Sequence, residues 1–328
     1  RQRDRERRRG VARVLVTRKI PQQAIERVRG ACGVKQWEND APIPREVLLE
    51  WARGVDGIYC LLTERIDAAL LDAAGPQLKV VSTMSVGYDH VDLSALRARG
   101  VALGNTPGVL TETTADLALA LLLAAARRLP EAWSAAKDGT WGPWQPEWMT
   151  GRDVHGSTVG IVGLGRIGAA VARRLLGFGC RIVYSGPRPR PELAEPLGAT
   201  YLSFEQLLAE SDFVSIHCPL NDATRHLFGA AAFAAMKPTA ILVNTSRGPV
   251  VDQEALYAAL KQGQIAAAGL DVTTPEPLPV DNPLFSLPSC VVLPHIGSAS
   301  LATRLQMALM AAENLIAGVD GKPLPNGV

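Results

Sequence analysis

Three chemically active side chains, an arginine, a carboxylate and a histidine, each follow an apolar run late in the sequence. Arg247 stands in Asn-Thr-Ser-Arg-Gly after one run, Glu276 comes shortly after a second, and His295 directly follows a third. If these runs are parallel strands, their carboxyl ends meet at one edge of a sheet, where such folds bind ligands. Arg247 could then clamp the carboxylate and carbonyl of a 2-keto acid. His295 could give a proton to the carbonyl oxygen as a hydride arrives, while Glu276 orients the imidazole and favours its protonated form.

A glycine-rich loop, Gly163-Leu-Gly165-Arg-Ile-Gly168, is the second chemical signal. It follows the apolar run Thr158–Val162 and opens a predicted helix, Ile167–Leu176. In this context the first glycine permits a tight turn, the second lets the backbone approach a pyrophosphate, and the third lets helix and strand pack closely. The helix N-terminus adds free N–H groups and a favourable dipole. The pattern therefore predicts a dinucleotide site.

The end of the next predicted strand, Arg181–Ser185, indicates which nicotinamide cofactor binds. NAD-binding proteins usually place an acid there for the ribose 2′-hydroxyl, but here no acid precedes Glu192. Ser185 could instead hydrogen-bond a 2′-phosphate, and Arg188 or Arg190 could pair with its charge. We expect NADPH as the cofactor, with NADH binding more weakly; the alternative is a solvated basic loop.

Alternating strand-like and helix-like segments position these residues and predict an α/β fold with parallel sheets. The expected strands are Ala12–Val16, Gly57–Cys60, Lys79–Thr83, Val101–Gly104, Thr158–Val162, Arg181–Ser185, Phe213–His217, Ala240–Asn244, Ala266–Val272 and Val291–Pro294. Long helices are expected over Thr111–Leu129 and Leu301–Ala317. After Pro130 we expect a loop that carries Trp133, Trp141, Trp144 and Trp148.

Length and composition are those of a globular protein of about two domains. The chain has 328 residues, 47% hydrophobic and 20% charged, which argues against disordered, collagen-like and disulfide-scaffold classes. Its net charge of +2 comes from the first nine residues, which hold six arginines; without them 28 basic residues face 30 acidic ones. We therefore expect no nucleic-acid partner. Residues 1–10 are expected to form a disordered basic extension, the alternative being a nucleic-acid or membrane contact.

The cysteines and apolar runs bear on the compartment. The five cysteines are scattered and contain no C-x-x-C pair, which favours a reducing compartment. The adjacent His217 and Cys218 lack a second ligand pair at suitable spacing, so no metal is expected. The longest apolar run, Leu117–Ala126, has ten residues, too few for a bilayer, and no signal peptide is visible. We expect a cytoplasmic protein without membrane contact.

Six sequence blocks carry a family resemblance. They are Ser85-Val-Gly-Tyr-Asp-His-Val-Asp, Gly160-Ile-Val-Gly-Leu-Gly-Arg-Ile-Gly, His217-Cys-Pro-Leu, Val243-Asn-Thr-Ser-Arg-Gly, Ala268-Gly-Leu-Asp-Val and Leu293-Pro-His-Ile-Gly-Ser-Ala. In this order they resemble the D-isomer-specific 2-hydroxyacid dehydrogenase family over nearly the whole chain. The resemblance implies two Rossmann-like domains, one flavodoxin-like and one dinucleotide-binding, with a cleft between them. Residues 11–108 and 300–328 would bind substrate, and residues 109–299 would bind NAD(P).

The resemblance also implies a function and further site residues. The expected function is NADPH-preferring reduction of glyoxylate to glycolate and of hydroxypyruvate to D-glycerate by a homodimer. Backbone N–H groups at Val86 and Gly87 would hold the substrate carboxylate. Further substrate candidates are Leu61, Ser298, Arg304 and Trp141. For Arg304, an ordinary solvated side chain is an equal alternative. Trp141 belongs to an arm that would reach the partner subunit, the alternative being an arm that only packs. Further cofactor candidates are Arg166, Ile167, Gly186, Cys218, Pro219, Thr224, Thr245, Ser246, Asp271 and Gly297. Pro187 stands where such reductases have arginine, and Arg188 would take its place.

Two alternative functions stay open from the sequence. A 3-phosphoglycerate-type dehydrogenase would use the same catalytic residues but would need further cations in its pocket. A nucleotide-sensing, corepressor-like binding protein would share the fold, and the missing acid after Arg181–Ser185 argues against it.

Overall fold

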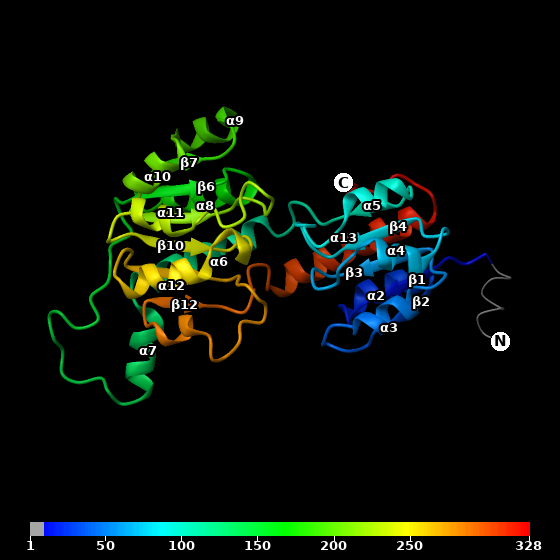
Figure 1. The fold of residues 1–328 in the computed structure, drawn as a ribbon, viewed down its shortest axis with the longest axis horizontal. Helices are drawn as coiled ribbons and strands as arrows, with labels where there is room; N and C mark the ends of the chain where they lie inside the picture. The colour runs from blue at the N-terminus through cyan, green and yellow to red at the C-terminus, as the bar shows by residue number, and fades with distance from the viewer. Residues whose placement is uncertain (1–9) are drawn as a thin grey trace. The chain divides into compact units, whose positions relative to one another are not determined.

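The computed structural model describes residues 10–328, which form two compact units. The first unit runs to Leu110 and is completed by Ala299–Val328; the second unit is Thr111–Ser298. Each unit contains its own parallel sheet with helices on its faces (Figure 1), so the predicted α/β class with two parallel-sheet domains is confirmed. The predicted basic extension, residues 1–10, lies outside the described residues except for Gly10.

The first unit is a five-stranded sheet in the order β2-β1-β3-β4-β5. Its strands are β1 (Arg13–Val16), β2 (Gly33–Gln36), β3 (Gly57–Cys60), β4 (Val80–Thr83) and β5 (Ala102–Gly104). Its helices are α2 (Gln22–Arg29), α3 (Arg45–Trp51), α4 (Ala68–Ala74), α5 (Leu93–Ala98) and α13 (Leu301–Val319).

Both faces of this sheet are buried, as expected for parallel strands. Val14 and Val16 on β1 pack with α2 and α13, whereas Leu15 between them packs on the other face with α3, α4 and α5. Helix α13 lies so close that a Cβ on Gly57 would come within 2.8 Å of Val319. The last long helix of the chain therefore completes a core begun by the first strand.

The second unit is a seven-stranded parallel sheet in the order β12-β11-β10-β9-β6-β7-β8. Its strands are β6 (Thr158–Val162), β7 (Arg181–Ser185), β8 (Thr200–Tyr201), β9 (Phe213–Ile216), β10 (Ile241–Asn244), β11 (Ala267–Leu270) and β12 (Cys290–Val292). Its helices are α6 (Thr111–Ala126), α7 (Leu129–Lys137), α8 (Arg166–Leu176), α9 (Pro191–Ala194), α10 (Phe204–Glu210), α11 (Ala230–Ala235) and α12 (Gln253–Lys261). Strand order reverses between β6 and β9, and in such sheets ligands bind at the carboxyl ends of the strands at this reversal.

The single helix predicted over Thr111–Leu129 is wrong at its end. Helix α6 stops at Ala126, and Arg128 adopts a left-handed backbone with φ of 54°. Helix α7 then starts at Leu129, with Pro130 in its first turn, where a missing N–H costs nothing. The segment after Pro130 is therefore first a helix, which carries Trp133, and only then the predicted loop.

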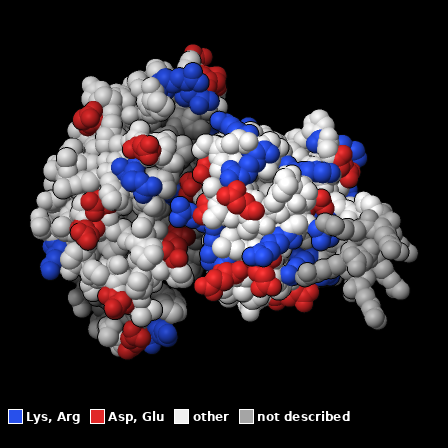
Figure 2. Space-filling view, turned by 45° about the vertical axis from the view of Figure 1, so that its right-hand side comes forward, with Lys and Arg blue, Asp and Glu red and all other residues white. Residues whose placement is uncertain are grey.

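Charged side chains of both signs are interspersed on the face of the molecule shown in Figure 2. Among residues 10–328, no helix combines the length and apolar character needed to span a bilayer. All five cysteines carry free thiols.

Candidate active site

The three glycines between β6 and α8 meet three different steric demands. Gly163 has a φ of 95°, and a Cβ on it would lie 2.6 Å from the Cys218 nitrogen. A Cβ on Gly168 would lie 2.4 Å from the Gly163 carbonyl oxygen, whereas a Cβ on Gly165 would meet nothing within 4 Å. The outer glycines are therefore required for packing, and the middle one leaves an open face over the loop.

Helix α8 begins beside this open face without a capping side chain. Gly165 is its N-cap residue, and Arg166 and Ile167 form the start of its first turn. The first N–H groups of such a helix have no intrahelical partner and, together with the helix dipole, favour an anion. Val171 and Leu175 are buried in the core of the second unit, so the helix end is held in place.

Two tyrosine hydroxyls shape the loop that follows β7. Tyr201 donates a hydrogen bond to the Gly186 carbonyl at 2.9 Å, and the Tyr184 hydroxyl accepts one from the Arg190 N–H at 2.9 Å. Ser185 is buried, and its carbonyl accepts from the Gly163 N–H at 2.9 Å. The loop after β7 is thus fixed next to the glycine loop.

The two arginines of this loop differ in their surroundings. Arg190 pairs with Glu192 at 2.5 Å, and this hydrogen bond lowers the pKa of the Glu192 carboxyl. Arg188 is exposed, and its guanidinium makes no ion pair within residues 10–328. Arg188 is therefore the available cation, a distinction that the sequence left open.

The loop after β9 borders the glycine loop on its other side. His217 Nε2 lies 2.8 Å from Ser215 Oγ, and burial lowers the pKa of this imidazole to about 4. Cys218 is buried beside it, and Thr224 Oγ1 donates to the Pro219 carbonyl at 2.6 Å, which holds the turn. The described residues contain no group of three or more His, Cys, Asp or Glu side chains that could hold a metal ion.

Asn244, at the end of β10, organises the loop that carries Arg247. Its buried side chain accepts hydrogen bonds from Ser246 N–H at 3.0 Å and Ser246 Oγ at 2.9 Å, and donates to the Arg247 carbonyl at 2.9 Å. A Cβ on Gly248 would lie 2.0 Å from the Thr273 carbonyl oxygen, so this loop touches the one after β11. Asn244 was missed from the sequence, although its place at a strand end, three residues before Arg247, was the available signal.

Asp271 connects the ends of β11 and β12. Its two carboxylate oxygens accept from Ile296 N–H at 2.8 Å and Gly297 N–H at 2.7 Å, and its carbonyl accepts from His295 N–H at 2.9 Å. Burial raises the pKa of this carboxyl, although the two N–H donors act in the opposite direction. Asp271 thereby fixes the backbone of His295, which has a left-handed φ of 54°.

The structure brings Glu276 and His295 into direct contact, with 2.7 Å between Glu276 Oε2 and His295 Nδ1. Thr273 N–H donates to the other carboxylate oxygen of Glu276 at 3.0 Å. Burial raises the pKa of Glu276, but the hydrogen bond and charge of His295, the Thr273 N–H and the charge of Arg247 together bring it below its ordinary value. The contribution of Thr273 was missed from the sequence, because it depends on a backbone N–H.

These contacts define what the edge of the sheet can do chemically. Strands β10, β11 and β12 are neighbours, so Arg247, Glu276 and His295 follow adjoining strand ends. An ionised carboxylate bonded to one ring nitrogen leaves the other nitrogen of a protonated imidazole as a proton donor. A cation at the neighbouring strand end can bind an anionic substrate.

The remaining candidates lie in the first unit. Leu61 follows β3, Val86 and Gly87 follow β4, and Arg304 lies in the first turn of α13. Each of them is partly exposed. His90 Nε2 lies 3.1 Å from Thr83 Oγ1, so this histidine is a hydrogen-bond partner of the last residue of β4.

Trp141 is not brought to the sheet edge. It is 69% exposed, on the segment after α7 that Figure 1 shows as an extended loop standing away from the seven-stranded sheet. Ser298 is the last residue of the second unit and is partly buried.

The residues at the carboxyl edge of the second sheet fit a nicotinamide dinucleotide. Thr245 Oγ1 is buried and has no hydrogen-bond partner among residues 10–328, and such an orphaned hydroxyl is suited to a ligand. A Cβ on Gly186 would, like one on Gly165, meet nothing within 4 Å. A pyrophosphate at α8 and a nicotinamide ribose at Thr245 would use these features.

Comparisons with known proteins agree with this geometry. Residues 119–297 match the family model described as D-isomer specific 2-hydroxyacid dehydrogenase, NAD binding domain. The chain is 51% identical to the glyoxylate reductase/hydroxypyruvate reductase of Homo sapiens, over 96% of this chain and 97% of the relative. It is 51% identical to the glyoxylate reductase of Korarchaeum cryptofilum, over 96% of this chain and 95% of the relative. A solved NADPH-dependent glyoxylate/hydroxypyruvate reductase from Sinorhizobium meliloti, in complex with NADP and malonate, is similar with a TM-score of 0.84, 37% identity and 97% of each chain covered.

Proposed function

The chain belongs to the family of D-isomer specific 2-hydroxyacid dehydrogenases, and we propose that it is an NADPH-preferring reductase of small 2-keto acids. Its substrates are glyoxylate, reduced to glycolate, and hydroxypyruvate, reduced to D-glycerate. The observation that carries this proposal is the 2.7 Å contact of Glu276 with His295, at the strand end next to that of Arg247. The names of relatives that are 51% identical support the choice of substrates.

In the proposed reaction each side chain has one task. Arg247 holds the substrate carboxylate and carbonyl oxygen, and the N–H groups of Val86 and Gly87 donate to the same carboxylate. The nicotinamide, when bound, supplies a hydride to the keto carbon. His295 donates the proton at Nε2 to the carbonyl oxygen, because Nδ1 is bonded to Glu276. Glu276 keeps the ring in this orientation and stabilises its positive charge.

The proposed cofactor site draws on several strand ends of the second unit. The pyrophosphate is held by Gly163, Gly165, Arg166, Ile167 and Gly168; the adenosine side by Ser185, Gly186, Cys218, Pro219 and Thr224; and the nicotinamide and its ribose by Thr245, Ser246, Asp271 and Gly297. Gly297 N–H is already bonded to Asp271 at 2.7 Å, which supports a rigid wall there.

The preference for NADPH rests on the loop after β7. Arg188 is exposed and forms no ion pair among the described residues, whereas Arg190 is bonded to Glu192 at 2.5 Å. We therefore assign the 2′-phosphate to Arg188, with Ser185 nearby in sequence as a hydrogen-bonding partner and Arg190 in a supporting role. The loop carries no acid before Glu192 that would select the 2′-hydroxyl of NADH.

The test follows oxidation of NADPH and of NADH with glyoxylate, hydroxypyruvate and 3-phosphohydroxypyruvate in parallel. We expect the highest kcat/KM with NADPH and the two unphosphorylated acids. Fastest turnover of 3-phosphohydroxypyruvate would replace the proposal by a phosphoglycerate-type activity. A chain that binds NADPH but oxidises it with none of the three acids would instead be a nucleotide-sensing binding protein.

We also propose a homodimer, in the cytoplasm. Helix α7 and the loop after it expose Leu129, Trp133, Trp141, Trp144 and Trp148, a concentration of large apolar side chains that favours a protein partner. Helix α6 does not add to this argument, because Leu121, Leu122 and its other inward side chains are buried within the second unit. Scattered free thiols favour the reducing cytoplasm. Light scattering that gave only the 35.0 kDa monomer at micromolar concentration would exclude the dimer.

A further inference from the structure

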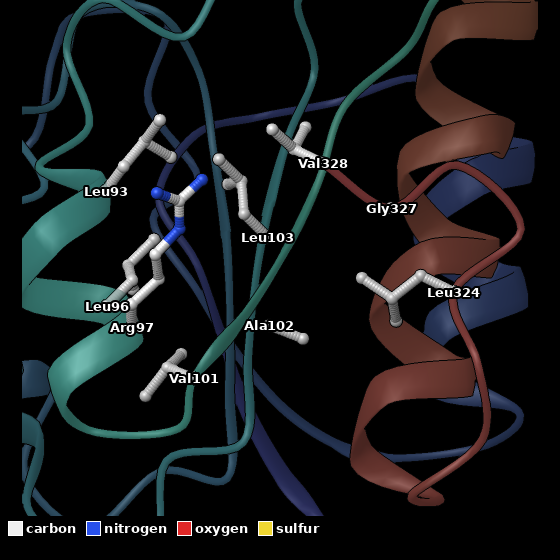
Figure 3. Close-up of a pocket in the computed structure, with 9 residues that line it drawn as sticks. All are labelled: Leu93, Leu96, Arg97, Val101, Ala102, Leu103, Leu324, Gly327 and Val328. Carbon is white, nitrogen blue, oxygen red and sulfur yellow. The ribbon is translucent and has the colours of Figure 1, made fainter.

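The segment after α13 returns to the first sheet and is bonded to the end of β5. Val328 N–H donates to the Leu103 carbonyl at 2.9 Å, and Gly327 forms an antiparallel bridge with Gly104. Figure 3 shows Val328 beside Leu103, and Leu324 between β5 and α13. The segment therefore acts as a short extra strand at the edge of the sheet.

Two asparagines lock this segment in place. Asn314, fully buried on α13, donates from Nδ2 to the Asn105 carbonyl at 2.8 Å and accepts at Oδ1 from Asn326 N–H at 2.9 Å. Asn105 N–H donates to the Asn326 carbonyl at 3.1 Å. A Cβ on Gly104 would lie 2.6 Å from Asn314, so α13 and β5 are in direct contact here. Both backbone groups of Asn105, its N–H and its carbonyl, are therefore hydrogen-bonded.

The side chain of Asn105 faces a different element, the loop after β4. Its Nδ2 donates to the Val86 carbonyl at 2.9 Å. The neighbouring carbonyl of Ser85 accepts from Thr106 N–H at 2.9 Å. Two successive carbonyls of the loop are therefore bonded to residues 105 and 106, which directly follow β5.

The bonding of these carbonyls determines where the next two N–H groups point. In a planar trans peptide the C=O and the following N–H point in opposite directions. The Ser85 carbonyl therefore orients the Val86 N–H, and the Val86 carbonyl orients the Gly87 N–H. Neither of these two N–H groups makes a hydrogen bond within residues 10–328. They form a pair of adjacent free donors suited to an anion.

We propose that Asn105 is a positioning residue for the substrate carboxylate, which aims the Gly87 N–H by holding the Val86 carbonyl. The segment Asn326–Val328, through Asn105, thereby becomes part of the support of the substrate site. The proposal rests on the proposed function, since that function assigns the carboxylate to the Val86 and Gly87 N–H groups.

The test compares Asn105→Ala with Ser82→Ala as a matched control. Ser82, like Asn105, is a buried polar residue, and its Oγ donates to the Ala311 carbonyl on α13 at 2.7 Å rather than to the loop after β4. Both variants lose one side-chain hydrogen bond to a backbone carbonyl of the first unit, Asn105→Ala to the loop after β4 and Ser82→Ala to α13. Asn105→Ala is expected to raise the KM for glyoxylate about tenfold and to leave the KM for NADPH unchanged. The reason is that the Gly87 N–H, no longer held in direction, loses its hydrogen bond to the charged substrate carboxylate. Ser82→Ala is expected to change neither.

A second variant and a second measurement separate positioning from general damage. Asn105→Ser keeps a polar side chain that is too short to reach the Val86 carbonyl, and it should raise the KM for glyoxylate in the same way. Inhibition by oxamate, which carries a carboxylate but accepts no hydride, should weaken about as much as the KM rises. Unchanged KM and oxamate inhibition in both Asn105 variants, in an enzyme that does reduce glyoxylate, would overturn the inference and leave the proposed function intact. A wild-type chain that reduces no keto acid would remove the proposed function itself, and the inference with it.

Discussion

The replacement Gly165→Ala isolates ligand contact from folding in the cofactor loop. Gly165 has φ of −100° and ψ of −162°, a conformation open to any L-residue, and an added Cβ would meet nothing within 4 Å. The folded chain should therefore tolerate alanine, and the loss of glycine's freedom in the unfolded state should raise stability by about 0.4–1 kcal/mol. The cost should appear only when a pyrophosphate needs the space that the methyl group occupies.

The size of that cost follows from crowding. Forcing one methyl group into a close-packed contact costs about 1–3 kcal/mol. Because each 1.4 kcal/mol is tenfold in an equilibrium constant, the Kd for NADPH should rise between roughly 5-fold and 150-fold. Gly163→Ala should behave in the opposite manner, because its φ of 95° is unfavourable for alanine and its Cβ would lie 2.6 Å from the Cys218 nitrogen. That variant should lose stability with no ligand present.

The assay measures the thermal midpoint of each ligand-free variant and the Kd for NADPH from quenching of tryptophan fluorescence. Gly165→Ala should match or exceed the wild-type midpoint and bind NADPH weakly, while Gly163→Ala should melt earlier. If Gly165→Ala bound NADPH as tightly as the wild type, the pyrophosphate would not lie over this glycine. If it melted as early as Gly163→Ala, the steric argument for the loop would be wrong.

The remaining predictions concern the proton, the substrate and the cofactor phosphate. His295→Ala should lower kcat by about 10²–10⁴ at unchanged NADPH affinity, as stopped-flow binding would check. Because the pKa of Glu276 is lowered, its carboxylate is ionised at the pH values where an imidazole titrates. In Glu276→Gln the rate of reduction should therefore fall at neutral pH and recover partly at lower pH. A pH–rate profile with the wild-type midpoint would rule out the Glu276–His295 pair as the proton donor. Arg247→Ala should affect kcat/KM for the keto acid most, measured beside the KM for NADPH. Arg188→Ala should raise the KM for NADPH but not for NADH, and more than Arg190→Ala does; equal effects on both cofactors would contradict the assignment.

Three strands could be predicted from the sequence to the residue: Gly57–Cys60, Thr158–Val162 and Arg181–Ser185. Their interior residues are apolar and buried, the pattern that indicates a strand covered on both faces. Strand β2, Gly33–Gln36, was missed because it is an edge strand with only half-buried residues and so has no apolar signal. Strand β8 was missed because it has only two residues, both exposed. The break between α6 and α7 was missed because it depends on the left-handed backbone of Arg128, which a hydrophobic periodicity does not reveal.

Part of the candidate site could be predicted from the sequence and part could not. The place of Arg247, Glu276 and His295 at adjoining strand ends could be anticipated, since parallel strands present their carboxyl ends at one edge. The choice between Arg188 and Arg190 could not, because it depends on one local ion pair with Glu192. The bonds of Asn244, like those made by backbone N–H groups, depend on side-chain directions that residue type alone does not give.

The return of the chain to its first unit has a consequence for biosynthesis. Translation delivers the sheet of that unit first, but the face formed by Val14, Val16 and Val80 is covered by α13, more than two hundred residues later. The second unit, contiguous in sequence, can close its core as soon as it has left the ribosome, whereas the first has only α2 on this face until α13 is made. On a nascent chain the first unit is therefore completed after the second, and a ribosome that stalls before Leu301 leaves the first unit without the helix that completes its core.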